Sequence, residues 1–284
     1  NRLERQDVLN VIKGYGGNIK NPKPGYKETI DLSAYNEGTH KLTIKVINPV
    51  TQEILETTTR NFIISRTSPY YYGIDVSHHQ GAIDWAKVKK DGIDFAILRA
   101  GYRGWGISDD GTNGKLVQDS KFDYNATNAI KNGIPIGAYF FSQAINEKEA
   151  IEEANFMLSI IKDYKITYPV IIDVEYSGAP NYSGRADKIS KDMRTKICDA
   201  FLKTIKNEGY TPMIYADKYF ATDNLDMSKL SSYQFWLAHY TGATQDNPFL
   251  KPSNYKGTYK MWQYTSKGKV NGISTDVDMN IWYK

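Results

Sequence analysis

Hydrophobic and polar positions alternate in the first part of the chain. In KLTIKVI (residues 41–47) each apolar residue is next to a polar one, and the turn-like NPVTQE leads into ILETTTRNFII. This period of two is typical of antiparallel strands with one solvated face. We therefore expect residues 1–67 to form a small all-β module and residues 68–71 to form a linker.

After residue 71 the pattern changes. The short apolar runs YYGIDVS, DFAILRA, IPIGAYFF, YPVIIDVE and TPMIYA alternate with helical patterns such as EKEAIEEANFMLSIIKDY and KDMRTKICDAFLKTIKNEG. Strands that alternate with helices predict parallel βαβ units. The runs QFWLAHY, YKMWQYT and VDMNIWY then follow with only loops between them. Eight strands and about five helices predict a closed α/β barrel over residues 72–284, with an open doubly wound sheet as the alternative.

Composition narrows the class of protein. The chain has 284 residues, of which 40% are hydrophobic and 24% charged, as in an ordinary globular protein. A net charge of +4 without a dense basic stripe does not predict nucleic-acid binding, and no apolar run is long enough to predict a membrane span. The single cysteine, Cys198, is expected to be a buried small hydrophobe. The start NRLERQDVLN is not a signal peptide. The sequence begins in mid-pattern, as expected for a piece of a longer chain. Nothing in the sequence predicts an oligomeric state.

Acidic residues occur where predicted strands end. They are Asp75 in GIDVS, Asp173 and Glu175 in IIDVE, and Asp276 and Asp278 in TDVDMN. Parallel α/β folds place their active sites at this edge of the sheet. Strand residues two apart point to the same side, about 6.5–7 Å apart, so a buried pair should contain one carboxyl with a raised pKa. The alternative is that Val174 points inward while both acids face a solvated loop.

Paired carboxylates without a cofactor motif indicate glycoside hydrolysis. A metal site is the competing interpretation, because His78 and His79 follow Asp75, but only four histidines exist and no HExxH motif is present. We therefore expect no metal and no cofactor, and we expect His78 to orient a carboxylate. GYRGWG lacks the spacing of a phosphate-binding or dinucleotide-binding loop. A non-catalytic carbohydrate-binding protein and a metal-dependent polysaccharide deacetylase are the alternatives.

Six segments give the chain a family resemblance. GIDVSHHQGAIDW, FAILRAGY, PIGAYFF, PVIIDVE, WLAHY and MWQYTSKGKVNGISTDVDMNIW resemble, in order and content, the family 25 glycoside hydrolases, the bacterial and phage N-acetylmuramidases called lysozymes. The resemblance spans about residues 71–284. It implies a modified (β/α)5β3 barrel that cleaves the β-1,4 bond between N-acetylmuramic acid and N-acetylglucosamine in peptidoglycan. It also implies that Glu175 is the general acid/base and Asp173 its partner, with Asp75 and Asp278 on the first and last strands; Asp276 is the second choice for the last position.

The resemblance further implies a saccharide groove. The expected substrate-binding residues are Tyr139, Tyr215, Tyr240, Trp262, Tyr264, Arg99 and His78. The expected partner is cell-wall peptidoglycan, so the protein would be secreted, cell-wall associated or a phage endolysin. Retention of anomeric configuration is favoured, either by attack of Asp173 or with help from the substrate's acetamido group. Residues 1–67 resemble the immunoglobulin-like modules of bacterial surface enzymes.

Overall fold

The computed structural model describes residues 2–3, 25–26, 35, 38–48, 50–64, 70–105, 113–245 and 248–284. The chain divides into two compact units, Asn1–Ser68 and Pro69–Lys284. Each unit is described by itself below.

The described part of the N-terminal unit consists of antiparallel strand pairs. β1 (Arg2–Leu3) pairs with β2 (Gly25–Tyr26), and β3 (Gly38–Ile47) pairs with β4 (Ile54–Ile64). The strands predicted at residues 41–47 and 54–64 are therefore confirmed, although β3 begins three residues earlier. Asn48 Oδ1 accepts a hydrogen bond of 2.9 Å from Val50 N, which holds the turn between β3 and β4. The immunoglobulin-like character of this unit stays a prediction.

The C-terminal unit is a closed barrel. Its strands are β5 (Tyr70–Val76), β6 (Phe95–Arg103), β8 (Ile136–Phe141), β9 (Ile166–Asp173), β10 (Pro212–Asp217), β11 (Gln234–Ala238), β12 (Met261–Gly268) and β13 (Val277–Tyr283). They pair in the order β5-β13-β12-β11-β10-β9-β8-β6, and β5 also pairs with β6, which closes the ring. The short β7 (Leu116–Gln118) adds to β6 outside the ring. The predicted closed α/β barrel is confirmed and the open sheet is wrong; Tyr70 and Tyr71 belong to β5 rather than to a linker.

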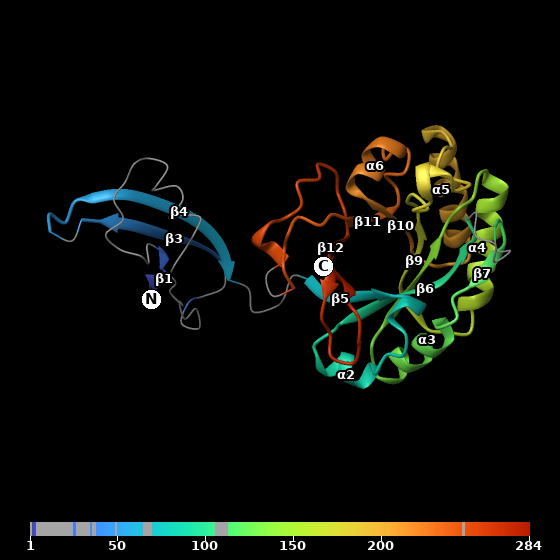
Figure 1. The fold of residues 1–284 in the computed structure, drawn as a ribbon, viewed down its shortest axis with the longest axis horizontal. Coiled ribbons are helices and arrows are strands. Elements are labelled where there is room, and N and C mark those ends of the chain that lie inside the picture. Colours follow the sequence, from blue (N-terminus) through green and yellow to red (C-terminus); the bar gives the residue numbers. More distant parts are fainter. Residues whose placement is uncertain are drawn as a thin grey trace. The chain divides into compact units, whose positions relative to one another are not determined.

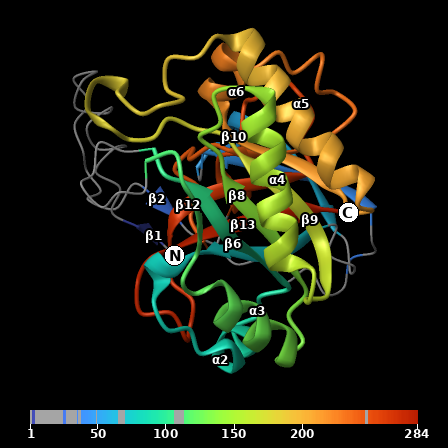
Figure 2. The ribbon, with the colours of Figure 1, turned by 90° about the vertical axis from the view of Figure 1, so that its right-hand side faces the viewer.

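The strands of the ring are parallel except the last one, and the α-helices lie outside the ring. Within the ring, neighbouring strands are parallel from β5 to β12, whereas β13 runs antiparallel to both β12 and β5. The α-helices on the outside are α2 (Trp85–Lys90), α3 (Phe122–Lys131), α4 (Glu147–Ile161), α5 (Lys191–Asn207) and α6 (Lys218–Asn224) (Figures 1 and 2). The described connections among β11, β12 and β13 contain one short 3-10 helix, η3 (Pro248–Leu250). The parallel strands therefore all end at one edge of the barrel.

The long helices have the capping residues and apolar faces that their sequences predict. Asn146 Oδ1 accepts from Glu149 N at the start of α4, and Ser190 Oγ accepts from Met193 N at the start of α5. Cys198 is one of the buried residues of α5, as expected for a small hydrophobe. Two shorter 3-10 helices, η1 (His78–Gln80) and η2 (Pro180–Tyr182), follow β5 and β9.

Two hydrophobic layers fill the unit. The outer layer packs between strands and helices, and the inner layer fills the barrel with Phe95, Ile97, Ile171, Met213, Trp236 and Met261. The inner packing needs a glycine at Gly73, because a Cβ there would lie 2.3 Å from the Phe95 ring. The inner layer forms a solid floor, so polar residues further along the same strands lie above it.

Candidate active site

The end of β9 brings two carboxylates into one pocket. Ile171 belongs to the inner layer, and alternation along the strand directs Asp173 and Glu175 to the same side. Asp173 is only 5% exposed, and its side chain hydrogen-bonds to that of Glu175. Val174 packs instead in the outer layer. The alternative in which Val174 points inward and both acids face a solvated loop is therefore wrong.

Two more carboxylates complete the pocket from neighbouring strands. Asp75 near the end of β5 lies directly opposite Asp278 near the start of β13. The pocket has a volume of about 230 Å³ and is lined by Asp75, Tyr139, Asp173, Glu175, Tyr215, Trp236, Tyr240, Gln263 and Asp278. Asp276, the second choice for the last-strand position, is exposed and paired with Lys269. Four carboxylates thus face one small cavity at the C-terminal edge of the parallel strands.

Side-chain amides hold Asp75 in place. Its Oδ2 accepts hydrogen bonds from Gln263 Nε2 at 2.9 Å and from Asn280 Nδ2 at 2.7 Å. Gln263 Oε1 in turn accepts from the hydroxyls of Tyr215 at 2.9 Å and Tyr240 at 2.8 Å. Both amides are buried, so these contacts fix the position of the carboxylate. Sequence reasoning missed Gln263 and Asn280, although each is a polar residue within an apolar strand.

Burial and mutual repulsion favour protonated carboxyls in the pocket. The pKa of Asp75 and that of Asp173 lie well above the usual range, first because of burial and then because of neighbouring carboxylates. Burial, together with the charges of Asp217 and Asp278, raises the pKa of Glu175 to about 7. Burial raises the pKa of Asp278 to about 6. A proton donor is therefore available here near neutral pH.

A second cavity adjoins the carboxylate pocket. It has a volume of about 340 Å³ and shares Glu175, Tyr215 and Tyr240 with that pocket. Its other lining residues are Asp217, Lys218, Tyr219, Ala238 and His239. Tyr240 is 52% exposed, which makes its ring accessible at the rim. Glu175 thus lies where the two cavities meet, the position from which an acid could reach the bond between two bound sugar rings.

The prediction that Trp262 and Tyr264 line the saccharide groove is wrong. Trp262 and Tyr264 are both 0% exposed and pack in the outer layer. Trp262 Nε1 donates a hydrogen bond of 3.0 Å to the His239 carbonyl. Because side chains alternate along β12, the residue between them, Gln263, faces the pocket instead. Neither aromatic ring can stack on a saccharide.

Arg99 and His78 form a separate polar cluster. Arg99 Nε donates to Asp119 Oδ2 at 2.8 Å, and His78 Nδ1 lies 3.2 Å from the same oxygen. Neither Arg99 nor His78 lines the two cavities at Glu175, contrary to their predicted place in the groove. His78 orients a carboxylate, as expected, but it is that of Asp119. The charge of Arg99 lowers the pKa of Asp173, against the larger effect of burial.

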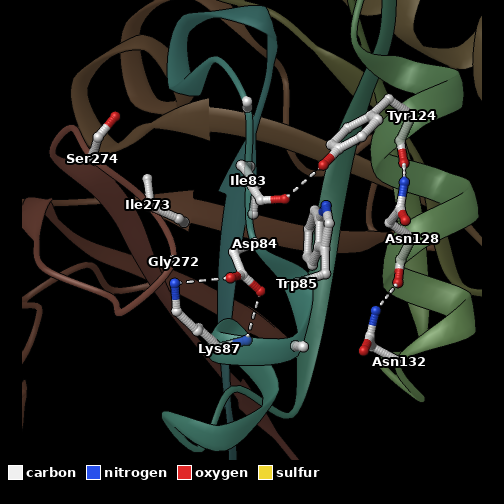
Figure 3. A pocket seen from close by; sticks show the side chains of 12 residues that line it. Ile83, Asp84, Trp85, Lys87, Tyr124, Asn128, Asn132, Gly272, Ile273 and Ser274 are labelled. Atoms are coloured by element: carbon white, nitrogen blue, oxygen red, sulfur yellow. Dashed lines mark hydrogen bonds and ion pairs between the residues drawn. The ribbon is translucent and has the colours of Figure 1, made fainter.

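A further cavity, of about 620 Å³, lies between α2, α3 and the loop before β13 (Figure 3). Its one acidic lining residue, Asp84, accepts from Lys87 N at the start of α2 and pairs with Lys87 Nζ at 3.0 Å. Paired carboxylates are absent from its described lining, in contrast to the pocket at Glu175. Among the described residues, no group of three or more His, Cys, Asp and Glu is arranged to hold a metal ion. None of the described helices has the length and apolar character needed to cross a membrane.

A closed α/β barrel with carboxyls of raised pKa beside an aromatic-lined groove defines the class as glycoside hydrolase. The model of glycosyl hydrolases family 25 matches residues 74–273, and the chain belongs to that family. Lysozyme M1 of Streptomyces globisporus is 32% identical over 216 residues, which cover 73% of this chain and 66% of that protein. YegX of Escherichia coli K12 is 29% identical over 231 residues, covering 78% and 74% of the two chains.

Solved structures agree with this assignment. The autolysin LytC of Streptococcus pneumoniae, in complex with a synthetic peptidoglycan ligand, is 29% identical with a TM-score of 0.63 and aligns over 78% of this chain. A bacterial lysozyme from Streptomyces coelicolor is 26% identical with a TM-score of 0.57, covering 77% of this chain and 94% of its own. The chain spans about half, 48%, of the LytC chain.

Proposed function

We propose that this chain cleaves the β-1,4 bond between N-acetylmuramic acid and N-acetylglucosamine in peptidoglycan, with Glu175 as general acid/base. The observation that carries the proposal is the position of Glu175, hydrogen-bonded to Asp173 and shared by the two cavities. A pKa of about 7 leaves a large part of its carboxyl protonated at neutral pH. The order of helices and strands supports describing the barrel as the modified (β/α)5β3 form.

The proposed reaction begins with proton transfer from Glu175 to the glycosidic oxygen. The bond from that oxygen to the sugar C1 breaks, and positive charge develops at C1 beside the carboxylates. Among the described residues, Oδ1 of Asp173 is a buried oxygen without a hydrogen-bond partner. It is available to accept from the substrate's acetamido N–H or to face C1. Glu175 then takes a proton from the attacking water, which restores the starting state.

The proposed substrate sets where the protein acts. Peptidoglycan lies outside the cytoplasmic membrane, so the enzyme would be secreted, associated with the cell wall, or released as a phage endolysin. The proposed reaction retains the configuration at C1, either by attack of Asp173 or through the substrate's acetamido group. Proton NMR of the first-formed anomer distinguishes retention from inversion, and an inverted product would contradict both roles of Asp173.

The variant Glu175→Gln tests the assignment. It keeps the size of the side chain and removes the transferable proton, so we expect the release of reducing ends from purified cell walls to fall at least about a hundredfold. Mass spectrometry of the fragments should show N-acetylmuramic acid at the new reducing end. Glu208→Gln, at the exposed end of α5, is the matched control and should retain activity. A folded Glu175→Gln protein with wild-type lysis would contradict the assignment.

A further inference from the structure

The cavity next to Glu175 borders a larger cavity with a basic lining. The two share Lys218, the first residue of α6. The larger cavity, of about 700 Å³, lies between the start of α5, α6 and the loop before β12. Its charged lining residues are Lys191, Lys218, Lys256 and Asp226. We call it the basic cavity.

Hydrogen bonds hold two of these lysines over the basic cavity. Lys191 Nζ donates to the Thr222 carbonyl at 2.9 Å, and Lys218 Nζ donates to Asn254 Oδ1 at 2.7 Å. An ammonium group has three N–H donors, so each contact fixes the lysine while leaving it able to donate to a ligand. Lys256 is exposed on the loop. These positions form a site with several cationic donors.

The acidic residues near the basic cavity bind groups other than its lysines. Asp226 accepts from Ser228 Oγ at 2.6 Å and pairs with Lys229 at 3.7 Å. Asp217, on the path toward Glu175, accepts from the backbone N–H groups of Tyr219 and Phe220 at the start of α6. The lysine charges are therefore not cancelled within the basic cavity. By contrast, the described residues that line the carboxylate pocket include four acids and no Lys or Arg.

We propose that the basic cavity binds the carboxylates of the peptide stem of peptidoglycan; this rests on the proposed function. The sugar rings of the polymer are uncharged, and its peptide carboxylates hang from the lactyl group of each muramic acid. With a muramic acid beside Glu175, the stem carboxylates would be attracted to the lysines at and beyond Lys218, whose charges are not cancelled within the basic cavity. The enzyme would thus prefer peptide-bearing glycan to bare glycan.

The test compares two forms of one substrate. Soluble glycan strands that carry peptides and the same strands stripped by an amidase are digested, and the ratio of their kcat/KM values is measured. We expect the wild type to favour the peptide-bearing form, and this preference should weaken with added salt because the lysines contact solvent. Lys256→Glu should lower the ratio at least about threefold, and Lys191→Ala should lower it less. Lys203→Glu, on α5 and away from the basic cavity, changes the net charge by the same amount as Lys256→Glu, is the matched control and should leave the ratio unchanged.

Different results would contradict the role of the basic cavity and the proposed function. A ratio that is the same in Lys256→Glu as in the wild type, or a wild type without any preference, overturns the role of the basic cavity. A wild type that releases reducing ends from neither form contradicts the proposed function instead. A fall of the ratio in Lys203→Glu as large as that in Lys256→Glu would also overturn the inference, because net charge alone would then explain it.

Discussion

Gln263 Nε2 donates a hydrogen bond of 2.9 Å to Asp75 Oδ2, and this contact links two strands of the barrel. The same amide accepts from the hydroxyls of Tyr215 and Tyr240 through Oε1. A neutral amide can serve a carboxylate and two phenols at once because it is both donor and acceptor. Gln263 therefore positions groups around the pocket without adding a charge to it.

Replacing Gln263 should damage activity and stability together. In Gln263→Leu, Asp75 keeps only the donor from Asn280, the Tyr215 hydroxyl loses its acceptor, and the Tyr240 hydroxyl keeps only Asp278 Oδ1 at 3.4 Å. We expect kcat/KM to fall about ten- to a hundredfold and the free energy of unfolding to fall by about 1–3 kcal/mol. Urea unfolding and a reducing-end assay measure the two effects. Gln263→Glu keeps the acceptor for the hydroxyls but places a further carboxyl against the buried Asp75, so it should restore neither the stability nor the activity. Wild-type activity in the leucine variant would show that the amide is dispensable.

The pH dependence of the reaction should follow Glu175. Its pKa is raised to about 7, and the protonated form is the acid, so kcat/KM should fall as the pH rises through about 7. The charge of Asp217 contributes to that raised pKa. Asp217→Asn keeps a side chain able to cap α6 and removes the charge, so the pH at which kcat/KM falls should be lower by about half a unit. A shift of this midpoint to higher pH, or a kcat/KM that does not fall at high pH, would contradict this electrostatic account.

The carboxylate pair can be predicted from the sequence, whereas Gln263 and the pairing of the last strand cannot. Asp173 and Glu175 are recognisable because charged residues rarely follow a buried strand without a function. The same period of two, applied to MWQYT, places Gln263 on one side of its strand and Trp262 and Tyr264 on the other. The two aromatic residues are predicted to face the sugar because their rings are large enough to stack on it. The position of Asp75 opposite Asp278 depends on the antiparallel pairing of β13 with β5, which spacing along the chain does not reveal.

Trp262 and Tyr240 should respond to mutation in opposite ways. Trp262 is fully buried in the outer layer, so Trp262→Ala should lower the free energy of unfolding by about 3–5 kcal/mol. Tyr240 lies at the rim and donates to Gln263, so Tyr240→Phe should lower kcat/KM while costing at most about 1 kcal/mol of stability. Chemical denaturation with kinetics on soluble glycan distinguishes the two. Trp262→Ala with normal stability and a raised KM would restore Trp262 to the saccharide groove.

The carboxyl of Glu175 should make the protein less stable as the pH rises. Its pKa in the folded protein, about 7, exceeds the ordinary value of 4.5, so the folded state binds this proton more tightly than the unfolded state. The stabilisation is complete below pH 4.5 and is lost as the pH rises through about 7. Glu175→Gln has no charge to bury, so at pH 8 it should be more stable than the wild type by about 1–3 kcal/mol. Near pH 4 the difference should shrink, whereas Glu208→Gln should show no such trend. Urea unfolding at both pH values measures this, and a difference that does not change with pH would show that Glu175 is not desolvated in the folded protein.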